Sequence, residues 1–157
     1  MDTISTCLWF DGQGEDAANH YVGIFPDSRI DRITRSTIAY PGGTEGDVLT
    51  VEFTLAGRSY MALNGGPGPS FDEAISLSIS CEDQAEIDRY RDALSADPEA
   101  EQCGWVTDRF GLRWQIVPRM LPTLLADPDR AKARRVMEAM VQMKTLDIAA
   151  LERAAAA

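Results

Sequence analysis

The chain has 157 residues, of which 45% are apolar and 25% charged, and it carries a formal net charge of -10. This composition is ordinary for a soluble globular protein, and a surface this acidic repels phosphate backbones, so we expect no nucleic-acid partner. Three cysteines without CxxC spacing and a single histidine form neither a disulfide framework nor a zinc site, and they fit a reducing cytoplasm. Because no stretch reaches the roughly 20 apolar residues of a membrane span, we expect a cytoplasmic protein with no membrane partner.

The first 64 residues predict a strand, a helix and three further strands. Residues 4–10 are rich in strand formers, and residues 15–25 have the apolar spacing of a helix with an acidic first turn. Residues 29–40 mix isoleucines with polar residues and predict an exposed strand. Residues 48–64 predict a hairpin that turns at Ala56 and Gly57.

The Gly- and Pro-rich stretch at residues 65–73 reads as a linker, and a second strand–helix–strand–strand series follows it. Residues 74–81 alternate strictly between serine and apolar side chains, which predicts a strand with one polar face. Residues 82–94 predict a helix, and residues 103–118 predict two strands around a turn at Phe110 and Gly111. A short additional strand is expected near residues 100–102.

The two halves can be superposed as an internal βαβββ repeat. Tyr21 and Tyr90 lie 69 positions apart in the two predicted helices, and the turn glycines Gly57 and Gly111 lie 54 positions apart. Such a repeat predicts two copies of one structural module. A generic α+β domain with coincidental similarity is the alternative from pattern alone.

The last part of the chain predicts helices. Residues 127–143 begin with Asp-Pro and carry an apolar stripe that suits either core packing or a subunit interface. Asp147 is a candidate N-cap for a final helix. The stripe consists of Ala133, Val136, Met137, Met140 and Val141.

Several local motifs resemble the PhnB-like branch of the vicinal oxygen chelate superfamily, which includes glyoxalase I, extradiol dioxygenases and bleomycin-resistance proteins. The motifs are NGGP, CEDQ, CGW, DxxGxxWQIVP and MxxMxxLDIAAL. This branch is often labelled 3-demethylubiquinone-9 3-methyltransferase-like. The resemblance implies an α+β fold in which tandem βαβββ modules form a cupped mixed sheet with C-terminal helices, and it implies a homodimer. We expect a single glyoxalase-like domain over residues 1–157, divided into module one (1–64), a linker (65–73), module two (74–118) and a C-terminal helical extension (119–157).

In catalytic members of the superfamily, each half supplies two metal ligands, from its first and last strands, and these point into the cup. The repeat offsets map those positions onto Cys7 and Met61 in the first half and Ser76 and Gln115 in the second. None of these is the anionic or imidazole donor that Mg, Mn, Fe or Ni sites use. We therefore expect no metal and no cofactor, and the pattern identifies no catalytic residue.

The same alternation adds four residues to the predicted ligand-binding cavity, so that its members are Cys7, Trp9, Ser59, Met61, Ser76, Ser78, Arg113 and Gln115. Some assignments have a structural alternative. A one-residue slip would place Thr6 rather than Cys7 in the cavity, and Gln115 is either a cavity residue or an amide bonded to backbone or solvent. Asn64 is a turn residue or a rim donor. Trp105 and Trp114 are expected in the core with their indole N–H groups bonded to backbone.

These features leave three classes of function open. The first is a small-molecule-binding protein without a catalytic metal, as resistance proteins of the superfamily are. The second is an enzyme: one of the glyoxalase or dioxygenase type with an atypical site, or the methyltransferase of the family label, which only the weak glycine pattern DGQGED supports. The third is a dimeric structural module whose cup is vestigial.

Overall fold

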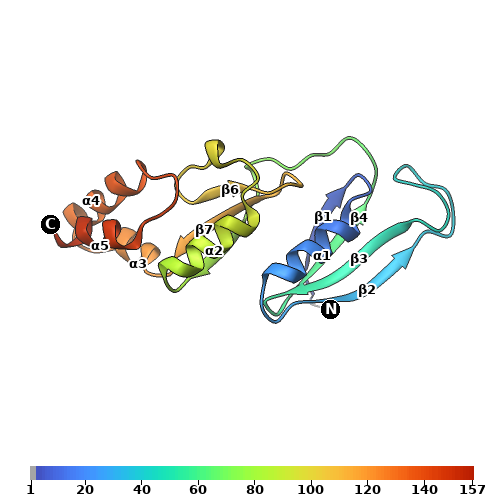
Figure 1. Ribbon diagram of the computed structural model, residues 1–157, viewed down its shortest axis with the longest axis horizontal. Coiled ribbons are helices and arrows are strands. Elements are labelled where there is room, and N and C mark those ends of the chain that lie inside the picture. The colour runs from blue at the N-terminus through green and yellow to red at the C-terminus, as the bar shows by residue number, and fades with distance from the viewer. Residues whose placement is uncertain (1–2) are drawn as a thin grey trace. The chain divides into compact units, whose positions relative to one another are not determined.

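The computed structural model describes residues 3–157, which divide into one compact unit up to Ser70 and another from Phe71 onward. The boundary falls inside the predicted linker, and the prediction of a single domain stays a prediction. In each unit a helix covers one face of a mixed sheet (Figure 1). No helix within residues 3–157 is long and apolar enough to cross a membrane.

The first unit has the predicted order of one strand, one helix and three strands. Its elements are β1 (Thr6–Phe10), α1 (Gly14–Ile24), β2 (Arg29–Arg35), β3 (Val48–Leu55) and β4 (Arg58–Asn64). The sheet order is β1-β4-β3-β2, with β1 parallel to β4 and the other neighbours antiparallel. The exposed strand predicted for residues 29–40 ends at Arg35, because Ser36 then turns the chain by donating its hydroxyl to Ile38 O at 2.6 Å.

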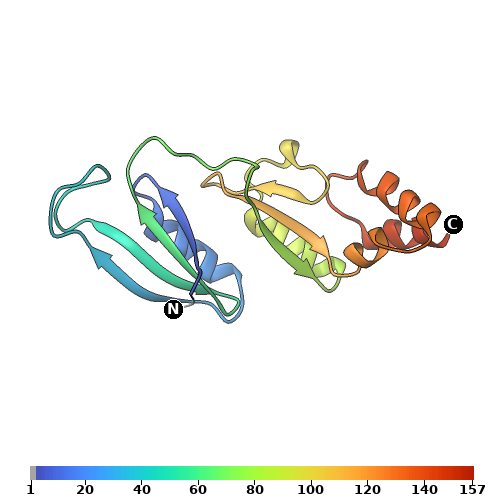
Figure 2. The same ribbon diagram turned by 180° about the vertical axis from the view of Figure 1, so that it is seen from behind.

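Strand alternation divides the first sheet into a buried face and an open face. Leu8, Val51, Phe53 and Ala62 lie on the face that α1 covers, and each is at most 4% exposed. Tyr21 on α1 is fully buried with them. Because successive strand residues point to opposite sides, the residues between these core positions face away from the helix. Figure 2 shows this second face, with the strands in front of α1.

The second unit repeats the arrangement with three strands in its described residues. Its elements are β5 (Leu77–Cys81), α2 (Gln84–Leu94), the 3-10 turn η1 (Pro98–Ala100), β6 (Trp105–Thr107) and β7 (Arg113–Pro118). The order is β5-β7-β6, with β5 parallel and β6 antiparallel to β7. The predicted short strand near residues 100–102 is wrong. Pro98 starts a 3-10 turn instead, and Gln102 makes an isolated bridge to Trp105.

The pairing of strands fixes how the two modules correspond. Cys7 lies beside Met61 in the first sheet, and Ser78 lies beside Gln115 in the second. Ser78, rather than the predicted Ser76, is therefore the counterpart of Cys7. Since the correction is two residues, both serines remain on one face. The tandem α+β fold with C-terminal helices is confirmed, with the second module one strand shorter than predicted.

Three helices follow the second sheet: α3 (Leu121–Leu125), α4 (Arg130–Met140) and α5 (Ile148–Ala156). Asp147 is the N-cap of α5, as predicted, and it accepts from Ala150 N at 2.8 Å. The predicted apolar stripe is divided. Val136 is fully buried, whereas Met137 and Val141 are 47% and 38% exposed. These helices share a core whose buried members are Leu121, Val136, Leu146 and Leu151.

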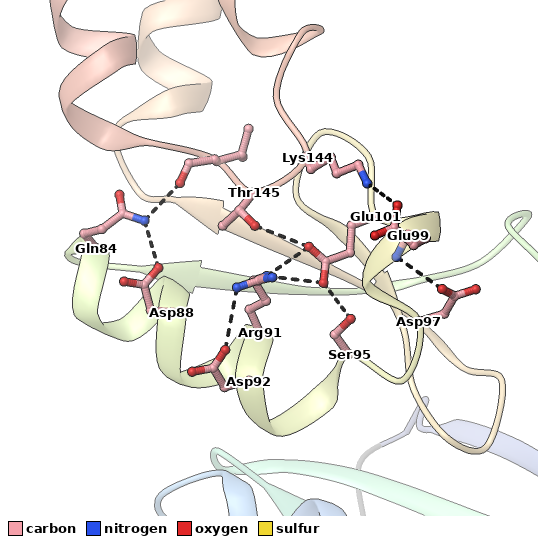
Figure 3. A network of polar contacts seen from close by, with 11 residues as sticks. Gln84, Asp88, Arg91, Asp92, Ser95, Asp97, Glu99, Glu101, Lys144 and Thr145 are labelled. Carbon is pink, nitrogen blue, oxygen red and sulfur yellow. Dashed lines mark hydrogen bonds and ion pairs between the residues drawn. The ribbon is translucent and has the colours of Figure 1, made fainter.

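A buried carboxylate joins the C-terminal helices to the second module (Figure 3). Glu101 is 3% exposed and accepts hydrogen bonds from Arg91 Nε at 2.9 Å and Ser95 Oγ at 2.6 Å. It also accepts from Thr145 Oγ1, in the segment before α5, at 3.3 Å. Burial raises the pKa of Glu101, but the bonds from Ser95 and Arg91, the charge of Arg91 and the bond from Thr145 together lower it below its ordinary value.

Candidate functional site

The open face of the first sheet carries the four predicted cavity residues of that module. Cys7 and Trp9 alternate with the buried Leu8 and Phe10, so Cys7 rather than Thr6 lies on this face. Met61 is the neighbour of Cys7 on β4, and Ser59 precedes it by one full strand period. The structure therefore brings Cys7 and Met61 together, as the repeat offsets predict.

A hollow of about 210 Å³ lies on this sheet. Ser59 and Met61 line it, whereas Cys7 and Trp9 do not. Its wall is more charged than the residues predicted from the sequence would make it, because Glu52 lies directly opposite Met61 on β3. Following the alternation along residues 48–55 would have placed Glu52 on this face. The lining residues are Ser5, Arg29, Asp31, Glu52, Phe53, Thr54, Ser59, Tyr60 and Met61.

The charges of this wall are paired along strands β2 and β3. Arg29 Nε lies 2.8 Å from Asp31 Oδ1, and Thr54 Oγ1 donates to Asp31 Oδ2 at 2.6 Å. Arg32 bonds to Glu52 through both Nε and Nη2. These pairs hold the charged groups in place, and in each pair the arginine side chain remains mostly exposed to water. The hollow thus combines hydroxyl groups and both signs of charge with the apolar Met61.

Trp9 and Asn64 hold the NGGP segment in place. The Trp9 indole N–H donates to Gly66 O at 2.8 Å, and its ring packs so closely on Gly65 that a Cβ there would lie 2.3 Å from it. Asn64 is buried, accepts from Gly14 N at 2.8 Å and donates to Val48 O at 2.8 Å. Asn64 is therefore a structural bridge between α1 and β3 rather than a rim donor.

The open face of the second sheet carries Ser76, Ser78, Gln115 and Arg113. Gln115 Nε2 donates to Ser76 Oγ at 2.8 Å, which brings two of the mapped positions into direct contact. Ser78 is exposed beside them. The amide in the middle of this strand is bonded to a neighbouring side chain, a partner that the sequence alternatives did not include.

Arg113 is held by two neighbours. Its Nε and Nη2 donate to Glu73 Oε1 at 3.2 and 2.9 Å, and Nη1 donates to Thr107 Oγ1. Arg113 also lines a second hollow, of about 400 Å³, at the edge of β6. Trp105 contributes to the same wall and is half-buried rather than in the core, which corrects the sequence prediction.

The aspartate that begins the DxxGxxWQIVP motif, Asp108, has a structural role. Asp108 is buried and accepts from Phe110 N at 2.8 Å and from Leu112 N at 3.0 Å. Its second oxygen accepts from the Trp114 indole N–H at 2.8 Å. Trp114 is in the core as predicted, but its N–H is bonded to a carboxylate and not to backbone.

The donor chemistry of the mapped positions does not fit a catalytic divalent metal. Cys7, Met61, Gln115 and either serine supply a thiol, a thioether, an amide and a hydroxyl, whereas Mg, Mn, Fe and Ni sites use carboxylates and imidazoles. Burial raises the pKa of the Cys7 thiol, which disfavours the thiolate that binds metals. Across residues 3–157, no group of three or more His, Cys, Asp or Glu side chains is placed to hold a metal ion.

Comparison with known proteins agrees with the motifs. The family model described as 3-demethylubiquinone-9 3-methyltransferase matches residues 2–117. The PhnB protein of Bacillus cereus is 32% identical, with a TM-score of 0.63 over 74% of this chain and 99% of its own. The fold of protein PA1353 from Pseudomonas aeruginosa is similar too, at 20% identity and a TM-score of 0.58 over 74% of this chain and 96% of its own. No curated protein matches.

The matched family region ends at residue 117, just before the C-terminal helices begin. The family model therefore covers the two modules and not the C-terminal helices. The two modules that precede them carry every predicted cavity residue. The chain belongs to the PhnB-like family described as 3-demethylubiquinone-9 3-methyltransferase, within the glyoxalase-like vicinal oxygen chelate superfamily that its motifs resemble.

Proposed function

We propose that this protein binds a small organic molecule on the open faces of its sheets and uses no catalytic metal. The observation that carries this proposal is the hollow of about 210 Å³ on the first sheet, where Met61 lies opposite Glu52 and two residues along β4 from Ser59. Apolar surface with a few convergent polar groups is typical of sites that bind small molecules. Ser59 and Met61 were predicted for this role from the sequence.

The methyltransferase description of the family receives no support from Gly14, where α1 begins after β1. Gly14 donates its backbone N–H to Asn64, and a Cβ at Gly14 would lie 2.8 Å from the Asn64 Oδ1 atom. The glycine is therefore required by contact with β4. A cofactor-binding glycine turn instead directs its backbone toward the ligand and opens a helix in a parallel sheet, whereas in this sheet only β1 and β4 are parallel.

One experiment tests the metal and ligand claims together. Purified protein is dialysed against Fe(II), Mn(II), Ni(II) and Zn(II) and analysed for retained metal, and it is screened against a panel of small aromatic and polar compounds by thermal unfolding. We expect no stoichiometric metal, and we expect compounds that raise the Tm of the wild type, because a ligand that binds the folded state stabilises it.

The matched variants are Met61→Trp, which fills the hollow, and Ile38→Trp, which changes an exposed isoleucine that does not line it. Met61→Trp is expected to remove the stabilisation by the compounds found in the screen, whereas Ile38→Trp retains it. A tightly held metal ion would contradict the metal-free reading and favour the enzyme alternative. Absence of any compound that distinguishes the two variants would contradict binding on the open face.

A homodimer in the cytoplasm completes the proposal. Met137 and Val141 are large apolar residues, one helical turn apart at the end of α4, and they remain exposed in the chain by itself. Such surface is suited to burial against a second copy. Light scattering on a size-exclusion column checks the mass: twice that of the chain supports the dimer, and a single chain's mass contradicts it.

A further inference from the structure

The second module has a hollow of about 400 Å³ at the edge strand β6. In the first module, β2 lies beside β3 at the corresponding position. In the second, the segment with η1 and the isolated Gln102 bridge takes that place. Ala100, Gln102 and Cys103 from this segment line the hollow together with the side chains of β6 and Arg113.

Arg113 lines this hollow, and its guanidinium uses only some of its N–H donors in bonds within the protein. Three of its donors are bonded, through Nε and Nη2 to Glu73 and through Nη1 to Thr107. A guanidinium has five N–H donors, so one on each terminal nitrogen remains for another acceptor. Thr107 is the cross-strand neighbour of Arg113, and their bond fixes the orientation of the plane.

Glu73 already presents a carboxylate to Arg113, with both bonds made to one oxygen. Its side chain is 71% exposed, whereas that of Arg113 is 22% exposed. An ion pair with so exposed a partner contributes little to stability. A carboxylate from a bound molecule can therefore replace Glu73 at small cost and meet the guanidinium in the planar, two-bond geometry that arginine favours.

Trp105 supplies an aromatic wall beside this cation. It is half-buried, lies opposite Gln115 on β7 and lines the same hollow as Arg113. An indole face stacks on other aromatic rings in offset geometry. The volume is in the range of small-molecule sites, so the wall and the cation together match a ring that carries an acidic group.

We propose that the edge hollow, defined by Glu73, Gln102, Trp105, Thr107 and Arg113, binds a planar aromatic carboxylate. The carboxylate bonds to Arg113 in place of Glu73, and the ring stacks on Trp105. This inference rests on the proposed function, because it names the chemical class of a molecule held on the second sheet. A net charge of -10 repels anions from the surface as a whole, so anion binding here requires a local cation.

The test uses naphthalene-2-carboxylate, with neutral naphthalene-2-carboxamide as the control ligand. Binding is measured by calorimetry and by the indole N–H signals in nitrogen-15 NMR spectra, where Trp105→Phe assigns the signal of Trp105. Arg113→Gln is expected to weaken carboxylate binding by about tenfold or more, because a charged hydrogen-bonding partner is lost. Glu73→Gln is expected to strengthen it by about two- to fivefold, because the competing carboxylate is removed.

Arg119 and Glu82 provide the matched controls, because they form an exposed Arg–Glu pair that does not line this hollow. Arg119→Gln and Glu82→Gln should leave binding unchanged. The inference is overturned if the carboxylate leaves the Trp105 signal unmoved, if the carboxamide binds as tightly, or if Arg119→Gln weakens binding as much as Arg113→Gln. In each case the Met61→Trp comparison on the first sheet still reports separately on the proposed function.

Discussion

The two modules share one arrangement of strands but secure it in different ways. In both, the first strand pairs in parallel with the last, and a helix of eleven residues covers one face. The first module has a fourth strand, whereas the second has a 3-10 turn in its place. The two modules therefore share the parallel strand pairing and the covering helix as a framework. They differ in their edge strands, their turns and the side chains of their open faces.

The hairpin turns show the largest difference in how the modules are held. The first module reverses direction at Ala56 and Gly57, both at positive φ, which is the geometry of a tight two-residue turn. The second uses a longer loop that closes around the buried carboxylate of Asp108. The turn is thus held by a buried side chain in the second module and by backbone conformation in the first.

Asp108→Ala is expected to cause the largest loss of stability. It removes three hydrogen bonds and leaves the buried Trp114 N–H without its acceptor, so we expect the free energy of unfolding to fall by about 3 kcal/mol. Asp108→Asn retains an oxygen for the two backbone donors and should cost less. Urea denaturation measures both variants, and equal losses would contradict a contribution from the two backbone bonds to Asp108.

The helix starts give a second contrast between the modules. Gly14 N at the start of α1 donates to Asn64 on β4, fifty residues away in sequence. At the start of α2, the local N-cap Asp83 accepts from Glu86 N at 2.9 Å. The strand position equivalent to Asn64 is Pro118, which has no side-chain acceptor for a helix. A long-range cap in one module therefore corresponds to a local cap in the other.

Asn64→Ala is expected to lower the free energy of unfolding by about 2 kcal/mol, because two buried bonds are lost. Asp83→Ala removes a solvent-exposed cap and should cost about 1 kcal/mol. Thermal and urea unfolding of both variants check the order. A larger loss for Asp83→Ala than for Asn64→Ala would reverse the comparison.

Most of the framework could be predicted from the sequence. The alternation predicted for residues 74–81 is followed by β5 from Leu77 to Cys81, and Tyr21 and Tyr90 of the two predicted helices are buried. The strand expected near residues 100–102 failed because Pro98 favours a turn and the segment is too short for periodicity to decide. The two-residue error at Ser76 has two sources: the connection after β1 is one residue longer than that after β5, and Tyr21 lies one position further into its helix than Tyr90.

The candidate site was harder to predict from the sequence than the framework. The faces of Cys7, Met61 and Gln115 follow from alternation, but the bond between Gln115 and Ser76 depends on side-chain geometry. The pairing of Arg113 with Glu73 joins residues 40 positions apart, and no local pattern marks it. The chemistry of the second hollow depends on such long-range contacts. Glu52, in contrast, could have been placed on the open face of the first sheet from the alternation along residues 48–55.

The C-terminal helices distinguish the second module from the first, and Glu101 tests how they are attached. Its folded-state pKa is depressed, so its contribution to stability is fully present above its unfolded pKa, about 4.3. The contribution is lost as the pH falls through the lower folded pKa. We expect Glu101→Gln to destabilise the protein at pH 7 and to lose less stability than the wild type between about pH 5 and pH 3.

Glu99 is the matched control for this effect, because its side chain is 91% exposed and pairs with Lys144 at 3.0 Å. Glu99→Gln should follow the wild-type profile of Tm against pH, since an exposed pair contributes little. If Glu99→Gln and Glu101→Gln flatten the profile equally, the acid sensitivity belongs to general surface charge. If Glu101→Gln alone flattens it, the acid sensitivity belongs to the buried carboxylate that Arg91, Ser95 and Thr145 bond.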